Sequence, residues 1–531
     1  MIRQRLSSSI KFQLIYQDET KFGSAVTGQC DTTIRRYCAS ITAHRNRYGL
    51  ANVVAHAREL LASTMVPGGL ADLYQRPNIL LEDWLYPDPK AVKPVALELE
   101  RNIGETIVIQ KLSPNLLSEL ALYLGEWQEG SNAPTTTIAR ELWNALDDYG
   151  ALVEVNELSV KPQLGHATFV GHSSLRLSDG NFSILFDPFL LPKSEVYPPN
   201  YQPLSLEEMG QPDAVFITHS HPDHFDLGTL LRVIASTPIF VPEVKRESVL
   251  AIDMALRLRQ LGFENIHTLR WFDETRIGGM RVIALPFYGE QPTVAQALHP
   301  EIRNEGNTYL IEYCDRRVAL TADSGSDCLG DVKKLAAVAL ERYGSLDTLF
   351  GGYRGFGLYP IQYLFSSVAR YLPFVPENSW QVRQKMMCDA DDLIDVAEIW
   401  NAKQIVPYSD GGAPWYWQRG LGPCLDGSQA HIMAVDPTPE HVCQVGTVRS
   451  GTRKDGAIAS PVSICLLRPG DALAFAQEDK RRQEEGSRLA VSVAEREQGG
   501  LVFAQEDTQV IQNQSWPYSI PRLPQVCNDS D

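Results

Sequence analysis

The residues best suited to chemistry lie in one short segment, THSHPDHFD, which spans residues 218–226. It places His219, His221, Asp223 and His224 in the pattern H-x-H-x-D-H. Residues two apart in an extended segment project to the same side, so the first two histidines can bind one metal ion together. Asp223 and His224 then face a neighbouring position, where a second metal ion fits about 3.5–4 Å away. The segment therefore predicts a two-metal site.

The segment before this motif, AVFIT, is apolar and predicts a strand that leads into the metal-binding loop. Residues 161–470 continue in the same way. Short β-branched or aromatic runs such as FSILF, MRVIALPF and NTYLIEY alternate with helical stretches such as DVKKLAAVALERY. Strands interleaved with helices predict a catalytic domain of α/β class with a central sheet.

Residues 1–160 predict a separate, mainly helical or winged-helix-like accessory domain. Apolar residues recur at three- and four-residue spacing in 51–63, in 115–127 and in TTTIARELWNALDDYG, where Gly150 stands as a helix cap. This domain is a candidate for homodimer contact, for binding another partner or for simple packing. The polar tail, residues 471–531, is interpreted as a C-terminal extension.

Composition excludes several classes of protein. The 531 residues include 48 Lys and Arg against 65 Asp and Glu, a net charge of −17, so no nucleic-acid partner is expected. No run of about 18 apolar residues occurs, so no membrane span is expected. The N-terminus lacks the continuous apolar core of a secretory signal. Nine unclustered cysteines are typical of reduced thiols, and the protein is predicted to be cytoplasmic.

The H-x-H-x-D-H loop resembles the signature of the metallo-β-lactamase superfamily. The pair Gly171–His172 ahead of Asp187–Pro188 also resembles the first strands of its lactonase-like branches. The resemblance covers residues from about 165 to 410. It implies an α/β (α+β) fold, the αββα sandwich, with metals at the edge of its two sheets. It also implies that Asp323, in TADSG, is the carboxylate that bridges the two metals.

Two imidazoles expected from this superfamily are missing. Its third His usually follows a strand and a Pro, where MRVIALPFYGEQP offers Glu290. Its last His normally follows a strand that ends in Pro, where QIVPYSDGG offers Asp410. The alternative is that His299 or His431 completes the site. With both carboxylates, the predicted ligands are three histidines and four carboxylates.

A carboxylate-rich ligand set favours iron or manganese over zinc. The Glu290 replacement resembles the di-iron oxygenase branch of the superfamily, that of the chloramphenicol-pathway β-hydroxylase, which also has an N-terminal accessory domain. This resemblance implies two iron ions, O2 and an external reductant or electron donor. It also implies hydroxylation of a small-molecule or carrier-protein-tethered substrate.

Two other functions stay open. One is a zinc- or manganese-dependent hydrolase of a phosphodiester, ester, lactone or amide, in which Asp223 is the catalytic residue that orients the attacking hydroxide. The other is a non-catalytic partner-binding protein with a relict site, although the complete first ligand cluster argues against it.

Three residues are candidate substrate contacts. They are His172 and, in the glycine-rich segment GGYRGFG, Tyr353 and Arg354. That segment matches neither phosphate-binding glycine pattern, so a loop near the site is the expectation.

Overall fold

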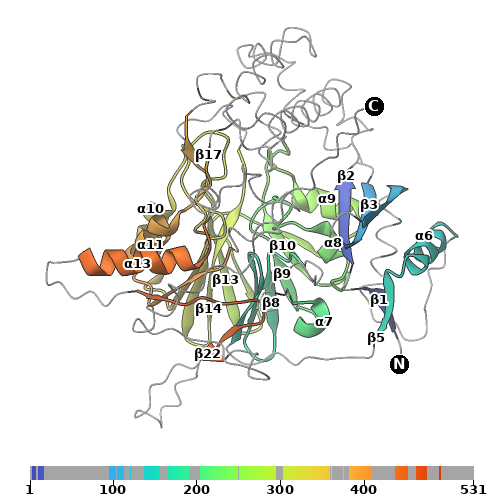
Figure 1. Cartoon of the computed structure of the whole chain (residues 1–531), viewed down its shortest axis with the longest axis horizontal. Helices are drawn as coiled ribbons and strands as arrows, with labels where there is room; N and C mark the ends of the chain where they lie inside the picture. Colours follow the sequence, from blue (N-terminus) through green and yellow to red (C-terminus); the bar gives the residue numbers. More distant parts are fainter. Residues whose placement is uncertain are drawn as a thin grey trace, which may run out of the picture.

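Two β-sheets lie face to face at the centre of the computed structural model, and helices cover their outer sides (Figure 1). This arrangement is the predicted αββα sandwich. The structure describes residues 3–7, 10–16, 86, 95–102, 105–112, 116, 120, 137–155, 166–190, 202, 204–248, 250–294, 303–358, 360, 375, 379, 382–409, 437–452, 462–474 and 490–491. Among them, no helix is long and apolar enough to cross a lipid bilayer.

The first sheet has the strand order β11-β10-β9-β8-β7-β6-β21-β22. Its strands are β6 (His166–Gly171), β7 (Ser174–Ser178), β8 (Ser183–Phe186), β9 (Ala214–Phe216), β10 (Ile239–Pro242), β11 (Ile266–Leu269), β21 (Ala472–Ala474) and β22 (Ala490–Val491). Strands β8 to β11 are parallel, so their carboxyl ends meet at one edge. Because β21 and β22 lie beyond residue 470, this sheet continues into the predicted C-terminal extension.

The second sheet has the strand order β12-β13-β14-β15-β16-β19-β20. Its strands are β12 (Glu274–Ile277), β13 (Met280–Pro286), β14 (Asn307–Tyr313), β15 (Arg316–Leu320), β16 (Thr348–Gly351), β19 (Gln404–Pro407) and β20 (Ser463–Ile464). Strand β14 is antiparallel to β13 and to β15, and β15, β16 and β19 are parallel. Strands β13, β15, β16 and β19 therefore all end at the same edge.

Aromatic side chains fill the space between the two sheets. The rings of Phe186 and Phe216 from the first sheet and Tyr309 from the second have centroids 5.4–5.6 Å apart. The Tyr309 hydroxyl donates a hydrogen bond of 2.8 Å to the Ile217 carbonyl. A buried hydroxyl needs such a partner, and this bond joins the second sheet to the segment just ahead of the H-x-H-x-D-H loop.

Helices cover the outer faces of both sheets. They are α7 (Leu206–Met209), α8 (Leu227–Leu230) and α9 (Met254–Gln260) on the first sheet, and α10 (Val332–Tyr343), α11 (Ala390–Ile399) and α13 (Glu440–Thr452) on the second. The helix predicted from DVKKLAAVALERY is confirmed as α10. Its apolar face, with Leu335 and Ala339, packs with α11 onto Leu349 and Ile405 of the sheet.

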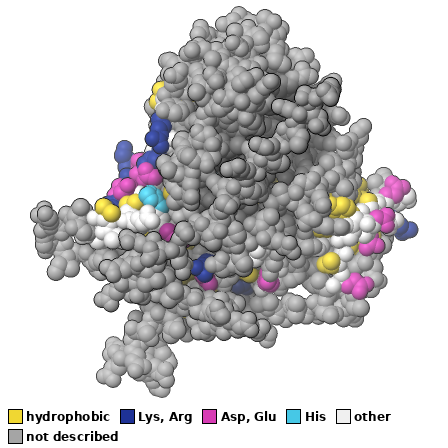
Figure 2. Space-filling model, viewed as in Figure 1, with side chains coloured by type: hydrophobic (Ala, Val, Ile, Leu, Met, Phe, Trp, Pro, Cys, Tyr) yellow, Lys and Arg dark blue, Asp and Glu magenta, His cyan; other side chains and the backbone are white. Residues whose placement is uncertain are grey.

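Acidic and basic side chains lie side by side on the outer surface around these helices (Figure 2). Arg449 of α13 pairs with Asp395 and Glu398 of α11 at 2.7 and 3.3 Å, and Lys333 of α10 pairs with Asp395 at 2.8 Å. Such exposed pairs contribute at most about 1 kcal/mol each. The apolar contacts beneath them therefore hold the helices in place.

The described N-terminal residues contain strands as well as a helix. They are β1 (Arg3–Leu6), β2 (Lys11–Tyr16), β3 (Val95–Asn102), β4 (Glu105–Leu112), α6 (Thr137–Asp148) and β5 (Leu152–Val155). Strands β1 and β5 pair with each other, and β2, β3 and β4 form a three-stranded sheet. The helix predicted from TTTIARELWNALDDYG is confirmed as α6. The helix predicted over 51–63 lies outside the described residues, and within 115–127 only Leu116 and Leu120 are described, both helical.

The strands among residues 1–160 follow a pattern that the mainly helical interpretation overlooked. In β3, Leu97 and Leu99 alternate with Glu98 and Glu100, and both leucines are buried. A period of two is typical of a strand with one buried face.

The N-terminal part packs against the outer side of the first sheet. Leu97 and Trp143 belong to the same buried cluster as Leu230 of α8. The guanidinium of Arg232 donates to the Ile10 carbonyl and lies 5.0 Å from the ring centroid of Phe12. The two predicted domains thus share a hydrophobic core, while homodimer formation through this part stays a prediction.

Candidate metal centre

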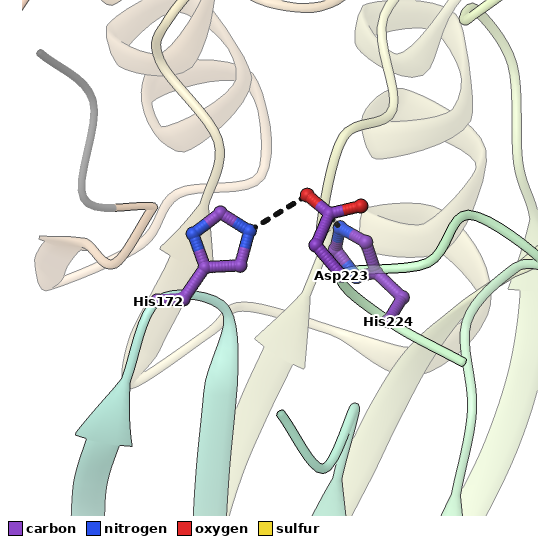
Figure 3. A group of neighbouring side chains, drawn as sticks. All are labelled: His172, Asp223 and His224. Atoms are coloured by element: carbon purple, nitrogen blue, oxygen red, sulfur yellow. Dashed lines mark hydrogen bonds and ion pairs between the residues drawn. The ribbon is translucent and has the colours of Figure 1, made fainter. Parts of the chain in front are cut away.

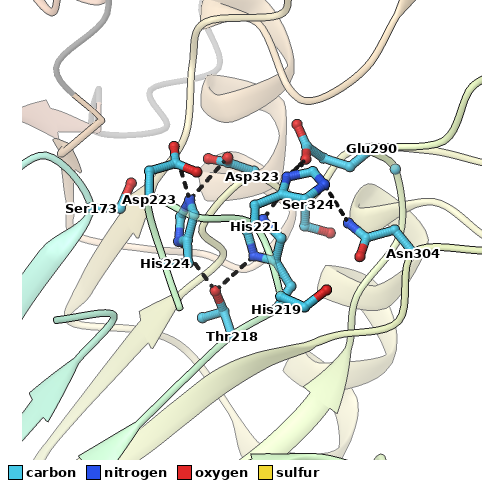
Figure 4. A network of polar contacts seen from close by, with 12 residues as sticks. Ser173, Thr218, His219, His221, Asp223, His224, Glu290, Asn304, Asp323 and Ser324 are labelled. Atoms are coloured by element: carbon cyan, nitrogen blue, oxygen red, sulfur yellow. Dashed lines mark hydrogen bonds and ion pairs between the residues drawn. The ribbon is translucent and has the colours of Figure 1, made fainter. Parts of the chain in front are cut away.

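The residues predicted to bind metal come together where strands of both sheets end (Figure 4). His219, His221, Asp223 and His224 follow β9, Glu290 follows β13, and Asp323 follows β15. All are buried except Asp223, whose side chain is 14% exposed. Asp410, His299 and His431 lie outside the described residues, so their predicted roles stay predictions.

One group of possible donors consists of His219, His221 and Glu290. Their ligand atoms all lie within 4.8 Å of one another. Glu290 Oε2 contacts His221 Nδ1 and is 3.8 Å from His219 Nε2. This group offers two imidazole nitrogens and one carboxylate oxygen to a single ion.

Asp323 and the second half of the loop form the neighbouring group. His224 Nε2 is 3.1 Å from Asp323 Oδ2 and 3.8 Å from Asp223 Oδ2. Asp323 is also within 4.8 Å of a donor atom of His219, which belongs to the first group. One carboxylate is therefore in reach of both positions, as a bridging ligand must be.

Asp187 and Thr218 orient two of the imidazoles. Asp187 Oδ2 accepts hydrogen bonds from His224 Nδ1 at 2.8 Å and from Thr218 Oγ1 at 2.7 Å. Because the Thr218 hydroxyl donates to Asp187, it can accept from His219 Nδ1 at 2.9 Å. A proton on both Nδ1 atoms leaves Nε2 of His219 and His224 with free lone pairs that face the cluster.

The third imidazole has the opposite orientation. His221 Nδ1 faces Glu290, and its Nε2 is 3.5 Å from the buried amide of Asn304. The Gln291 side chain holds Asn304 by accepting from its N–H at 2.9 Å and donating to its carbonyl at 3.1 Å. Asn304 Oδ1 has no hydrogen-bond partner in this orientation of the amide. With the amide turned over, Oδ1 accepts the Nε2 proton of His221 and leaves Nδ1 free for a metal.

The backbone at Glu290 is held in an unusual conformation. Its φ of 54° lies in the left-handed region, which costs of order 1–3 kcal/mol for a residue with a side chain. Its N–H donates to the Met386 carbonyl at 2.7 Å, and a Cβ at the preceding Gly289 would lie 2.7 Å from that same oxygen. The tight turn that brings Glu290 to the cluster therefore requires glycine at position 289.

The donor set fits a metal ion. His219 Nε2 is buried, yet it makes no hydrogen bond, and the contact of the buried Glu290 Oε2 is with another donor atom of the group, His221 Nδ1. Burial lowers the pKa of His219 well below its usual value, so this imidazole is neutral. Burial raises the pKa of Glu290, and the negative charge of Asp323 adds to that effect. A divalent cation would occupy the free lone pairs and offset the repulsion among the carboxylates.

Comparison with known families identifies this part of the chain. Residues 183–354, which include the H-x-H-x-D-H loop, Glu290 and Asp323, match the beta-lactamase superfamily domain. The observed sandwich and the position of the site at its edge agree with the predicted fold.

Known proteins similar to this chain include a hydroxylase and a hydrolase. The 4-amino-L-phenylalanyl-(CmlP-peptidyl-carrier-protein) 3-hydroxylase of Streptomyces venezuelae is 26% identical over 226 residues, 42% of this chain and 39% of the relative. A UPF0173 metal-dependent hydrolase of Rubrobacter xylanophilus is 29% identical over 116 residues, 22% of this chain and 42% of the relative. The chain thus aligns with about two fifths of the length of these curated relatives.

A solved structure extends the likeness beyond the beta-lactamase superfamily domain. CmlA, a diiron beta-hydroxylase from Streptomyces venezuelae, has a TM-score of 0.56 and 16% identity, with 89% of this chain and 100% of that chain covered. At this identity the comparison shows the fold alone.

The three predicted substrate contacts lie in different surroundings. His172 Nε2 is 2.8 Å from Asp223 Oδ2, so it belongs to the cluster itself. Tyr353 is buried among the apolar residues beneath the helices of the second sheet. Arg354 is also buried, with its guanidinium 4.2 Å from the Phe356 ring centroid. A substrate role for the three stays a prediction.

The sequence did not indicate the supporting roles of Asp187, Thr218 and Asn304. Asp187 comes directly after β8, and Thr218 is the second residue after β9. Both therefore lie at the carboxyl ends of parallel strands. A polar residue at that place was a usable signal, because such strand ends line ligand sites in open α/β sheets. Asn304 gave no comparable signal.

Thr218→Val should weaken metal binding about 10–100-fold, the usual effect of losing an outer-shell partner. The change removes the hydroxyl and leaves the His219 Nδ1 proton without its acceptor. Metal titration of the metal-free protein measures the effect, and Thr218→Ser, which keeps the hydroxyl, should bind as the unmodified protein does. Equal affinity in the Val and Ser variants would contradict this positioning role.

Proposed function

We propose that the chain is a dinuclear iron oxygenase that hydroxylates a small-molecule or carrier-protein-tethered substrate. The observation that carries the proposal is the group His219, His221 and Glu290, two imidazoles with one carboxylate. This ligand combination with open positions is typical of non-haem Fe(II) oxygenases. Some hydrolytic zinc enzymes use it as well, so the preference for iron rests on the further carboxylates Asp223 and Asp323 beside this group.

In the proposed site, His219, His221 and Glu290 would hold one metal ion, Asp223 and His224 would hold the other, and Asp323 would be shared between them. Two iron ions bound there would supply the redox chemistry that activates O2. Hydroxylation by O2 also consumes two electrons from outside the substrate, so an external electron donor is part of the proposal.

The chain's own residues fix the ligands and limit water. Asp187 and Thr218 hold the proton on Nδ1 of two imidazoles, as described above. The Phe287 ring stacks on His219 with centroids 5.0 Å apart, and Phe189 lies edge-on to His172 at 5.7 Å. Apolar rings against the ligands reduce solvent access, which protects a reactive centre from side reactions.

The Streptomyces venezuelae relative supports the substrate class. Its name describes hydroxylation of an aminoacyl group on a peptidyl carrier protein. Because the alignment spans about two fifths of that relative, carrier-protein binding by this chain is part of the proposal.

A metal-dependent hydrolase is the second candidate. The similarity to the Rubrobacter xylanophilus hydrolase favours it, as does the position of Asp223. The Asp223 side chain is the most exposed carboxylate of the cluster at 14%, so it can orient an attacking water.

Metal analysis decides between these candidates. Protein purified without chelators and reconstituted anaerobically with equal Fe(II) and Zn(II) should hold close to two metals per chain, with iron exceeding zinc, because of the carboxylate-rich ligands. With a reductant and an aminoacyl carrier protein, O2 consumption should match hydroxylated product. Stoichiometric zinc and no iron after reconstitution would contradict the oxygenase and favour the hydrolase.

A further inference from the structure

His172 is an imidazole of the cluster that lies outside the H-x-H-x-D-H loop. It stands in the turn between β6 and β7 and points at Asp223 and His224 (Figure 3). Its Nε2 is 2.8 Å from Asp223 Oδ2, and its ring centroid is 5.8 Å from that of His224. The ligand atoms of these three residues all lie within 4.8 Å of one another.

The turn that carries His172 is fixed to the rest of the site. Ser174 Oγ donates to the Asp187 carbonyl and accepts from the Phe189 N–H at 2.9 Å. Phe189 in turn packs edge-on against the His172 ring. His172 itself has a φ of 49° and is 3% exposed, so its ring is buried with little room to move. The imidazole is therefore already in position before a metal ion binds.

Among the described residues, none that directly follows β16 or β19 of the second sheet brings an imidazole to the position of Asp223 and His224. Strand β16 is followed by Gly352 and Tyr353, and β19 is followed by Tyr408 and Ser409. The Ser409 hydroxyl is 3.2 Å from that of Ser173, so the end of β19 contacts the β6–β7 turn. Among the described residues, the second imidazole grouped with Asp223 and His224 is His172, from the first sheet.

His172 gives the two metal positions equivalent donors. The first position has His219, His221 and Glu290. With His172, the second also has two imidazoles and one carboxylate, and Asp323 is shared between them. Both then present the combination that suits Fe(II).

We infer that His172 is a metal ligand, the second imidazole of the position formed by Asp223 and His224. The inference rests on the two-metal site proposed above and deepens it. The other role open to His172 is a hydrogen bond that orients Asp223 without contact to the metal. The two roles predict different metal stoichiometries, because a lost ligand removes an ion whereas a lost hydrogen bond weakens its binding.

Cobalt(II) titration of the metal-free full chain separates the roles, with visible absorption and elemental analysis of the desalted protein as readouts. The unmodified protein should reach two equivalents and His172→Asn one. Asn is suited to this test because it tolerates the left-handed backbone and has no atom at the place of Nε2, the nitrogen that faces Asp223. His267→Asn is the matched control, since His267 is an exposed imidazole on β11, and it should reach two equivalents.

Chemical rescue gives a second readout that an orienting role would not produce. His172→Gly suits the backbone and leaves space for a free imidazole. It should bind one equivalent alone and two when imidazole is added, with thermal unfolding confirming that it is folded. Two equivalents in His172→Asn, or loss of the second ion in Asp410→Asn with none in the His172 variants, would overturn the assignment.

The iron proposal and the ligand assignment fail in different ways. Cobalt binding does not depend on the preference for iron, so an iron-free enzyme with one equivalent lost in His172→Asn still supports His172 as a ligand. An unmodified protein that binds one equivalent would contradict the two-metal site and, with it, this assignment.

Discussion

Asp323→Asn should leave the protein with less than one metal ion per chain in place of two. Asp323 Oδ2 lies 3.1 Å from His224 Nε2, and its carboxylate is also within reach of His219. Removing the shared charge weakens both positions at once. The loss of affinity should exceed the about 10–100-fold that follows the loss of an outer-shell partner. Elemental analysis after anaerobic reconstitution measures it.

Asp315→Asn is the matched control for this substitution. Asp315 is exposed in the turn that precedes β15, so the same change is made near the opposite end of the strand that leads to Asp323. This variant should retain both metals. Two metals retained in Asp323→Asn would show that the carboxylate is not a ligand.

Glu290→His should move the site from iron towards zinc. The substitution turns the first position from two imidazoles and a carboxylate into three imidazoles, a typical zinc set, and removes one negative charge. Histidine also suits the position, because it is among the residues that tolerate the left-handed backbone seen at Glu290. Elemental analysis after reconstitution with equal iron and zinc should show a higher zinc-to-iron ratio, and O2-dependent turnover should be lost.

Two further variants make that result specific. Glu274→His introduces the same residue at an exposed site on β12 and should not change the ratio. His299→Ala addresses the competing assignment and should leave the metal content unaltered. If His299→Ala removed a metal while Glu290→His and Glu290→Ala had no effect, the site would be imidazole-rich, and the hydrolase would become the better proposal.

The sequence by itself predicted the parts of the site that depend on short-range patterns. The spacing of His219, His221, Asp223 and His224 after an apolar strand indicated the metal loop, because ligands within six residues need only one strand end to position them. The alternation of short strand-like runs and helical runs over residues 161–470 indicated the α/β class, because these runs are also short-range patterns. Glu290 and Asp323 came from a resemblance of short segments, and the structure brings both to the cluster.

In the N-terminal part, short-range patterns predicted a mainly helical domain, whereas its described residues form strands as well as a helix. The alternation in β3 is present in the sequence, but the segments 51–63 and 115–127 on either side of it have helical spacing, which favoured a helical prediction. The pairing of β1 with β5 joins residues about 150 positions apart, such as Arg3 and Val155. Such pairing depends on which apolar faces meet in the folded chain, and no local pattern records that choice.

Only the tertiary structure decided which residues complete and support the metal centre. His172 lies 51 residues from Asp223 in the sequence, and Asp187 lies 37 from His224, yet each pair is 2.8 Å apart. The sequence pointed to both His172 and Asp187 through the resemblance of short segments, but it did not indicate which residues each of them would contact. They become neighbours of the metal ligands because β6 to β9 adopt a particular order and register, so that their turns meet at one sheet edge. Order and register are set by packing across both faces of the sheet, which is a property of the whole domain.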